Sequence, residues 1–148
     1  MATTIRWYGD ALETRLREAA GQAVKRAAQL VVTRARLLAN RPATRIRRKR
    51  TRATVAGPKG SQYTVFVGSR PGQPPMVRTA FGRRNITAQY YPDALVARIG
   101  VDANADYMAY LEVGTERIAP RPWLRPALEQ SLPSITTILQ AGLREAVR

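Results

Sequence analysis

The chain has 148 residues and a formal net charge of +15, and it contains neither cysteine nor histidine. This length gives room for one domain with a modest core, which we expect to span residues 1–148. The missing cysteine excludes disulfides, thiolate metal sites and a cysteine nucleophile, and the missing histidine removes the side chain most often used for proton transfer near neutral pH. Neither an enzyme nor a bound cofactor is therefore expected.

The positive charge is concentrated in the first half of the chain. Residues 1–74 carry a net charge of +13, whereas residues 75–148 carry +2. Leu, Ile, Val and Phe make up roughly 22% of the residues, close to the level below which a highly charged chain stays disordered. Contacts between subunits would add stability at about 25 cal/mol per Å² of buried apolar surface. We therefore expect an oligomer, and no run of apolar residues is long enough for a membrane span.

The first predicted element is a long helix that has Asp10 as its N-cap and runs to about Ala39. Its apolar residues recur at spacings of three and four, which places them on one face. At 1.5 Å per residue this helix is roughly 45 Å long, more than a compact domain of this size needs. Two interpretations remain open, because the helix either packs only on its own sheet or also reaches a neighbouring subunit. The opposite face carries Arg15, Arg17, Lys25, Arg26, Arg34 and Arg36.

A strongly basic arm follows at about residues 40–60. Within "RPATRIRRKRTR", residues 41–52, Ile46 is the only large apolar residue, so we expect a loop or an extended arm with no buried face. Three interpretations remain open for its basic residues: contact with nucleic-acid phosphates, contact with an acidic partner protein, or exposure to solvent. These residues are Arg41, Arg45, Arg47, Arg48, Lys49, Arg50 and Arg52.

Three strands are predicted after the arm. The alternating residues of "SQYTVFVGS", 61–69, indicate the first strand, and the prolines in residues 70–75 exclude a central strand there. Two further runs, residues 85–91 and 94–101, are separated by a turn at Pro92. We expect these two runs to form an antiparallel pair.

The chain then contains a short apolar segment, residues 107–115, and ends in a helix from about Trp123. Apolar residues keep helical spacing across Pro133, which predicts one kinked helix rather than two. The predicted fold class is therefore α+β, with a long N-terminal helix, a small antiparallel β-sheet and a kinked C-terminal helix. The spacing is kept by Leu124, Leu128, Leu132, Ile135, Leu139 and Leu143.

A rigid corner precedes the last helix. Gly114 permits a backbone conformation closed to other residues, and Thr115 can hydrogen-bond within its own turn. Pro122 is suited to the start of a helix and fixes the direction of Trp123, which either anchors the core or projects as a knob into a neighbouring subunit. Glu112 is expected to pair with an arginine in a structural role. The candidate assembly residues are Glu112, Gly114, Thr115, Pro120, Pro122, Trp123, Leu124 and Pro126.

The segment "YMAYLEVGTERIAPRPWLRPALEQS", residues 107–131, combines a tyrosine-rich strand, Glu-x-Gly-Thr, a Pro-x-Pro-aromatic-Leu-x-Pro-Ala corner and a helix. This combination resembles the tailed-bacteriophage neck proteins, also called tail-completion or head–tail joining proteins, of the minor tail protein Z type. "SRPGQPPMVRTAFGRRNITAQYY" is similar to the linker that precedes the corner in that family. The likeness covers about residues 68–131. It departs where Ala80-Phe81-Gly82 replaces Thr-Gly-x-Leu and where Asn85 replaces a serine.

The resemblance implies a structural virion protein at the head–tail junction, in the neck or tail-terminator layer, assembled in the host cytoplasm. It implies a homo-oligomeric ring of six or twelve copies that contacts head-completion and tail proteins, but no membrane. Non-specific contact of the basic arm with passing DNA stays one open interpretation, because the resemblance does not extend to the role of that arm. A closed ring needs two different contact patches on each subunit, and we expect Trp123 and Leu124 to form or support one and the long helix to supply the other. The alternative is a basic nucleic-acid-binding protein that contacts phosphates through residues 41–52.

Overall fold

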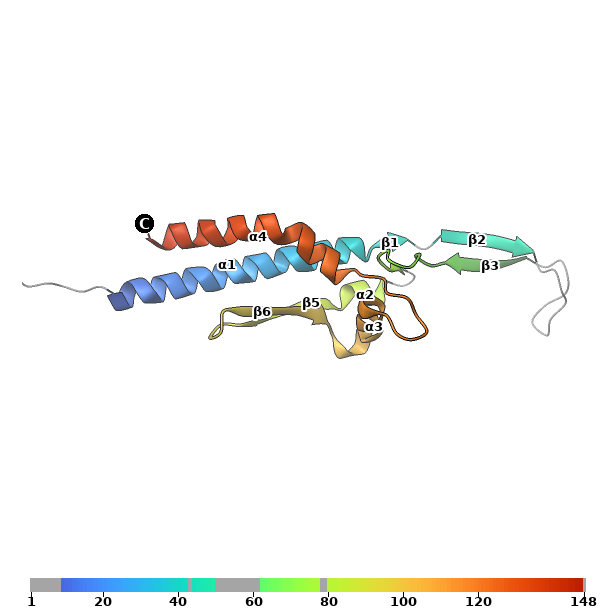
Figure 1. The fold of residues 1–148 in the computed structure, drawn as a ribbon, viewed down its shortest axis with the longest axis horizontal. Coiled ribbons are helices and arrows are strands. Elements are labelled where there is room, and N and C mark those ends of the chain that lie inside the picture. The colour runs from blue at the N-terminus through green and yellow to red at the C-terminus, as the bar shows by residue number, and fades with distance from the viewer. Residues whose placement is uncertain (1–8, 43, 50–61, 78–79, 148) are drawn as a thin grey trace, which may run out of the picture.

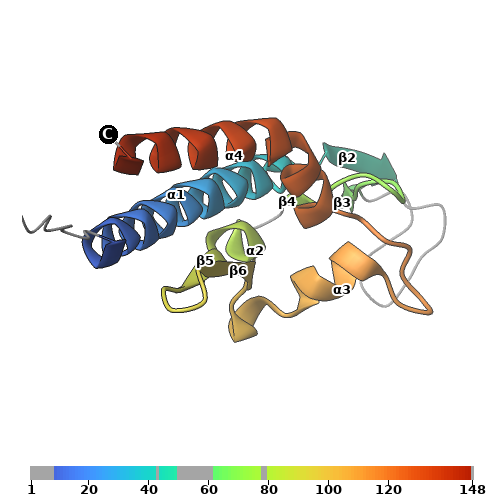
Figure 2. The same ribbon diagram turned by 60° about the vertical axis from the view of Figure 1, so that its left-hand side comes forward.

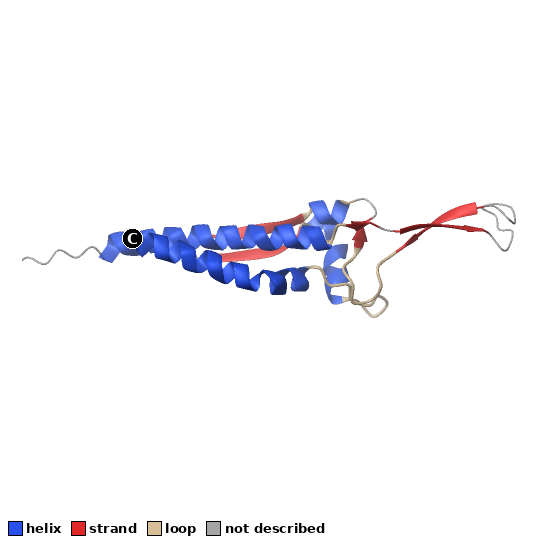
Figure 3. Ribbon diagram, turned by 90° about the horizontal axis from the view of Figure 1, so that it is seen from above, coloured by secondary structure: helices blue, strands red, loops and turns tan. Residues whose placement is uncertain are grey.

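The computed structural model describes residues 9–42, 44–49, 62–77 and 80–147 and has an elongated shape (Figures 1 and 3). Its longest element is the N-terminal helix α1, Gly9–Leu38. This helix forms one half of the molecule together with the C-terminal helix, and a two-stranded ribbon extends from the opposite end (Figure 1). The predicted α+β class with a long N-terminal helix is confirmed.

Helix α1 has the predicted length, but one detail of the prediction is wrong. Asp10 lies inside the first turn of the helix rather than capping it. Two arginines of the face opposite the apolar one also bond to carbonyls. Arg36 donates to the Ile86 carbonyl through Nε at 3.2 Å and Nη2 at 2.7 Å, and Arg34 donates to the Gln130 carbonyl. The reason is that α1 is flanked by structure on two sides, so long arginine side chains reach neighbouring main chain.

Helix α1 is the middle of three layers (Figure 1). Helix α4, Leu124–Val147, runs antiparallel along one side of it. The hairpin formed by β5, Ile86–Tyr91, and β6, Val96–Val101, covers the other side. Both faces of α1 are therefore occupied over much of its length.

Small residues allow these layers to approach closely. A Cβ atom at Gly142 of α4 would lie 3.0 Å from the Cβ atom of Ala23 in α1. A Cβ atom at Gly21 of α1 would lie 2.6 Å from the hydroxyl oxygen of Tyr90 in β5. Because α1 presents alanine and glycine to both neighbours, the interior contains few large side chains.

Helix α4 continues across Pro133, which confirms the prediction of one helix. Proline lacks an N–H group and crowds the carbonyl four residues earlier, that of Glu129. Figure 1 shows the helix axis changing direction between its orange first turns and its red last turns, as expected for a proline kink. Arg34 of α1 donates to the adjacent Gln130 carbonyl, so the kink is bridged by the neighbouring helix.

The β5–β6 pair is antiparallel, with Ile86 opposite Val101 and Tyr91 opposite Val96, and confirms the predicted hairpin. Alternate residues of β5 face inward, and Ile86 is fully buried. The turn that joins the strands ends at Leu95, which adopts a positive φ of 52°. The hairpin thus buries one face against α1.

The basic arm is a strand rather than a loop over part of its length. Strand β2, Thr44–Lys49, pairs antiparallel with β3, Gln62–Val67, which is the strand predicted within residues 61–69. At the base of this ribbon, β1, Arg41–Pro42, pairs parallel with β4, Met76–Val77. The prediction left a loop or an extended arm open, and β2 takes the extended form because its main chain is hydrogen-bonded to β3. The ribbon points away from the helices (Figures 1 and 3).

The predicted tyrosine-rich strand is instead helix α3, Tyr107–Val113, which follows a short 3₁₀ turn, Ala103–Ala105. The helix buries Met108 and half-buries Leu111, three residues later, so one side of a helical turn packs inward. This tertiary contact overrides the strand preference of tyrosine and valine.

A short helix, α2, forms where the sequence departs from the motif of the neck proteins. It spans Phe81–Arg84 and follows Ala80, which has a left-handed φ of 60°. Asn85 ends it, because its side-chain amide donates to the Phe81 carbonyl at 2.8 Å. The chain therefore turns here and then enters β5.

The main core cluster lies where α1, β5, α3 and α4 meet. Its large members are Ile86, Met108 and Trp123, and the others are Val32, Ala35, Ala39 and Ala127. The corner before α4 therefore reaches into the centre of the molecule.

Candidate assembly surface

The corner between α3 and α4 begins at Gly114, which ends α3. Gly114 has φ +81°, and its N–H donates to the Tyr110 carbonyl at 2.8 Å. A Cβ atom there would lie 3.0 Å from the Ile118 carbonyl oxygen and 3.0 Å from Pro120 N. Both the conformation and the space require glycine at this position.

Thr115 holds the next turn, as predicted. Its hydroxyl accepts hydrogen bonds from the N–H groups of Arg117 at 3.3 Å and Ile118 at 3.1 Å. The backbones of Thr115 and Ile118 are also bonded to each other, with Thr115 N donating to Ile118 O at 2.8 Å. The chain then returns to α3, where Arg121 N donates to the Leu111 carbonyl at 2.6 Å.

Glu112 caps helix α4 from the end of α3. Its carboxylate accepts hydrogen bonds from three consecutive backbone N–H groups: Trp123 at 2.6 Å, Leu124 at 2.8 Å and Arg125 at 2.8 Å. The next residue, Pro126, has no N–H to satisfy. The first turn of α4 is thus almost fully paired, and a negative charge lies at its positive end. The expectation that Glu112 pairs with an arginine is replaced by this cap.

Trp123 is a core residue of the protomer and not a projecting knob. Only 1% of its surface is exposed, and its Nε1–H donates to the Met108 carbonyl at 2.9 Å. Its backbone N–H is held by Glu112, so both ends of the residue are fixed. The ring fixes the angle between α3 and α4, and Leu124 beside it is half-buried against the same cluster.

The predicted corner residues lie together, whereas the described basic residues lie on β1 and on the ribbon that extends beyond the corner (Figure 1). Gly114, Thr115 and the segment through Pro126 form one continuous structure around Trp123. Arg41 lies on β1, and Arg50 and Arg52 fall outside the described residues. The other basic residues lie on β2: Arg45, Arg47, Arg48 and Lys49.

A surface that the sequence pattern does not predict runs along α4. Helical spacing predicts that its leucines share a face, but the residues packed on α1 are small, with Ala127, Ser131 and Ala146 buried. The leucines lie on the adjacent side of the helix. Leu128, Leu132 and Leu143 are exposed, and Ile135 and Leu139 are half-buried. We call these five residues the leucine seam. In the sequence, the face of α4 that packs on α1 is marked by small residues spaced four apart, at 127 and 131 and again at 142 and 146.

A second apolar surface lies on α3 and its neighbours. Tyr107, Tyr110 and Val113 are spaced three apart on one face of α3, and all three are exposed, Val113 by 75%. Ile118 in the following turn and Phe81 of α2 are exposed as well. We call these five residues the tyrosine patch. Helix α2 touches α3 here, because a Cβ atom at Gly82 would lie 2.5 Å from the Tyr107 hydroxyl.

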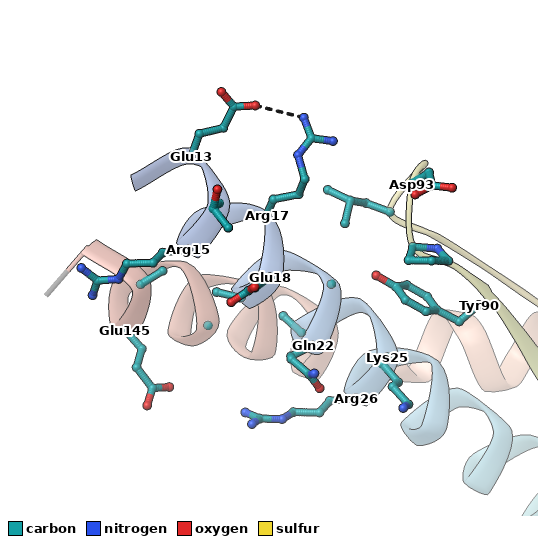
Figure 4. Close-up of a pocket in the computed structure, with 18 of the residues that line it drawn as sticks. Glu13, Arg15, Arg17, Glu18, Gln22, Lys25, Arg26, Tyr90, Asp93 and Glu145 are labelled. Atoms are coloured by element: carbon teal, nitrogen blue, oxygen red, sulfur yellow. Dashed lines mark hydrogen bonds and ion pairs between the residues drawn. The ribbon is translucent and has the colours of Figure 1, made fainter. Parts of the chain in front are cut away.

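Two grooves lie around the first turns of α1. One, of about 1,230 Å³, has charged residues from α1, the β5–β6 turn and the end of α4, among them Glu18, Asp93 and Glu145 (Figure 4). The dashed line in Figure 4 marks the exposed ion pair between Glu13 and Arg17, whose charged atoms lie 3.1 Å apart. The other groove, of about 1,110 Å³, is mostly apolar and is lined by Leu12, Leu16, Leu95 and Leu143. The leucine seam therefore continues onto α1 at this end.

In the ranges 9–42, 44–49, 62–77 and 80–147, no three His, Cys, Asp or Glu side chains are grouped so that they could hold a metal ion. No helix within the same ranges has the length and apolar character needed to cross a bilayer.

Comparison with protein-family models, with curated proteins and with solved structures finds no match to this chain.

Proposed function

We propose that this protein is a structural virion component that forms a homo-oligomeric ring at the head–tail junction of a tailed bacteriophage. Its partners would be further copies of itself and the neighbouring head-completion and tail proteins. The proposal assigns it no catalytic activity. It combines the family resemblance of residues 68–131 with the distribution of apolar residues over the protomer.

The observation that carries the ring is an inversion of residue size between the interior and the surface. Among the described residues, eight of the thirteen buried hydrophobic residues are alanines, whereas twelve large hydrophobic residues are exposed. A protein that functions as a monomer usually buries its large apolar residues and exposes no extended apolar patch. Further copies of the chain would cover these side chains.

The experiment is to measure the native mass of the purified protein by light scattering and to image it by negative-stain electron microscopy. We expect a mass of six or twelve times 16.4 kDa and round particles with a central hole. Antibody labelling of purified phage particles should then mark the junction between head and tail. A protomer mass at all concentrations, with no labelled particles, would refute the proposal.

The β2–β3 ribbon favours a second candidate function, binding of nucleic acid. Its strand β2 has the sequence TRIRRK, in which four of the six residues are basic. The ribbon projects from the helices (Figure 3), and cations on such an element could follow a phosphate backbone without reading bases.

Salt dependence tests this second function. Replacing Arg45, Arg47 and Lys49 by glutamine should lower the slope of log affinity against log salt for duplex DNA by about 0.9 per lost phosphate contact. The matched control replaces the same number of charges on α1, at Arg15, Arg17 and Lys25. Equal changes in both variants would mean that only net charge matters, and the ribbon would then have no specific role in binding.

A further inference from the structure

Two apolar surfaces of different chemistry occur on this protomer. The leucine seam is aliphatic and extends along α4 at spacings of four, three, four and four residues. The tyrosine patch is shorter and mostly aromatic, with hydroxyl groups on Tyr107 and Tyr110. Together with the groove residue Leu12, the two surfaces account for most of the exposed large hydrophobic residues of the described chain.

The two surfaces lie on different elements. Helix α4 forms the outer layer on one side of α1, and α3 lies past the end of the β5–β6 hairpin (Figures 1 and 2). Leu128, Leu132 and Leu143 of the seam and all five residues of the tyrosine patch are exposed, so neither surface covers the other within one protomer. A contact between identical patches would need only one such surface, whereas a ring in which each subunit binds the next needs two different ones.

We infer that the leucine seam of one copy packs on the tyrosine patch of the next copy. This inference rests on the proposed ring and specifies the contact that builds it. The exposed leucines, centred on Leu132, would pack on the rings of Tyr107 and Tyr110, and the tyrosine hydroxyls would remain at the wet rim. Val113, the most exposed large hydrophobic residue described, would be covered as well.

Charge complementarity points to a second copy as the occupant. Residues 102–118, which contain α3 and most of the tyrosine patch, hold four acidic residues and one arginine, a net charge of −3 in a chain of +15. Glu112 is occupied by the helix cap, but Asp102, Asp106 and Glu116 are exposed. The leucine seam is bordered by Arg125, which is largely exposed and has only a long 3.9 Å contact to Glu129. The acidic rim of one surface therefore matches a cation beside the other.

The absence of cysteine from the chain makes cross-linking a direct test. Two variants, Leu132→Cys and Val113→Cys, are co-expressed with different affinity tags and treated with a short bis-maleimide. We expect a cross-linked product that carries both tags, and little product when either variant is treated alone. The control is Thr137→Cys with Val113→Cys. Thr137 is exposed on α4 but lies roughly 140° around the helix from Leu132, so its yield should be at least tenfold lower.

The outcomes separate the contact from the ring itself. Products that join Leu132→Cys to itself, or Val113→Cys to itself, would mean that identical patches meet and would overturn the inference. An oligomeric mass without the two-tag product would leave the ring standing and refute this contact. A protomer mass without any product would refute the ring and the contact together. Equal yields with Thr137→Cys would show random collision and would also count against the contact.

Discussion

The corner around Trp123 and the contact between α1 and α4 hold the protomer together in different ways. At the corner, single groups have directed partners, such as the Glu112 carboxylate on three N–H groups and the Trp123 indole on a carbonyl. Between α1 and α4, the fit depends on small residues such as Gly142 against Ala23. The corner thus fixes an angle through a few strong contacts, whereas the helix contact spreads its stabilisation over its length.

The small residues in the contact between α1 and α4 explain why the leucines of the seam are left out of that contact. A helix that packs through glycine, alanine and serine approaches its partner closely, and the flanking leucines are left beside the contact rather than inside it. The corner, in contrast, buries its one large aromatic completely. We therefore expect substitutions at the corner to affect the folding of the protomer and substitutions on the leucine seam to affect assembly.

The largest effect is expected for Trp123→Ala. Loss of a fully buried indole that joins four elements should lower the free energy of unfolding by about 3–5 kcal/mol. Urea denaturation followed by circular dichroism measures this change. Trp123→Phe keeps most of the packing but loses the hydrogen bond to the Met108 carbonyl, so it should cost less. Equal stability of Trp123→Ala and the wild type would contradict the central role of the ring.

A smaller effect is expected for Glu112→Gln. The amide has one acceptor oxygen and presents its own N–H groups to the start of α4, so at least one of the three backbone donors loses its partner. The free energy of unfolding should fall by about 1–3 kcal/mol. The control is Glu116→Gln in the adjacent turn, where the side chain is exposed and the change should stay within about 0.5 kcal/mol. If both variants behave alike, the cap does not stabilise the corner.

Substitution of Gly142 should have a graded effect on the helix contact. A leucine there would collide with Ala23 and force α1 and α4 apart, which should cost about 1–2 kcal/mol, at the lower end for overpacking because the site is near the end of α4. Alanine also approaches Ala23 closely, but it favours the helix by about 1 kcal/mol over glycine, so Gly142→Ala should be nearly neutral. Chemical denaturation of both variants measures the difference. Equal losses would mean that the contact tolerates no side chain at all.

The sequence predicts the long regular elements because their periodic patterns extend over many residues. Helices α1 and α4 and the β5–β6 hairpin were expected close to their observed bounds. Helix α3 was expected as a strand, since seven residues rich in tyrosine and valine fit either structure. The helix is selected by burial of Met108 and by the cap that Glu112 makes. Such contacts join residues distant in sequence and cannot be read from a local pattern.

The candidate surface was only partly predictable for a similar reason. Periodicity indicates which residues share a face of α4, but two faces lie side by side, one of leucines and one of small residues. The approach of α1 decides which face is covered, and Gly142 and Ser131 show that the small one is. The corner was predicted as a unit because glycine and proline act on their own backbone. The partner of Glu112 was not, since a carboxylate can pair with an arginine or with a helix end equally well.

The smallest effect on the protomer, and the largest on assembly, is expected for Leu132→Asp. The Leu132 side chain is 53% exposed and lies beside the contact with α1, so the protomer should lose less than about 0.5 kcal/mol. This value is measured at a concentration low enough for light scattering to give the protomer mass. At higher concentration the same variant should keep that mass while the wild type assembles, because the aspartate would be buried without a partner in the contact between copies. Thr137→Asp, on another side of α4, should assemble normally. If Leu132→Asp instead lowers the stability of the dilute protomer by 2 kcal/mol or more, then Leu132 belongs to the core and the distinction drawn between corner and seam fails.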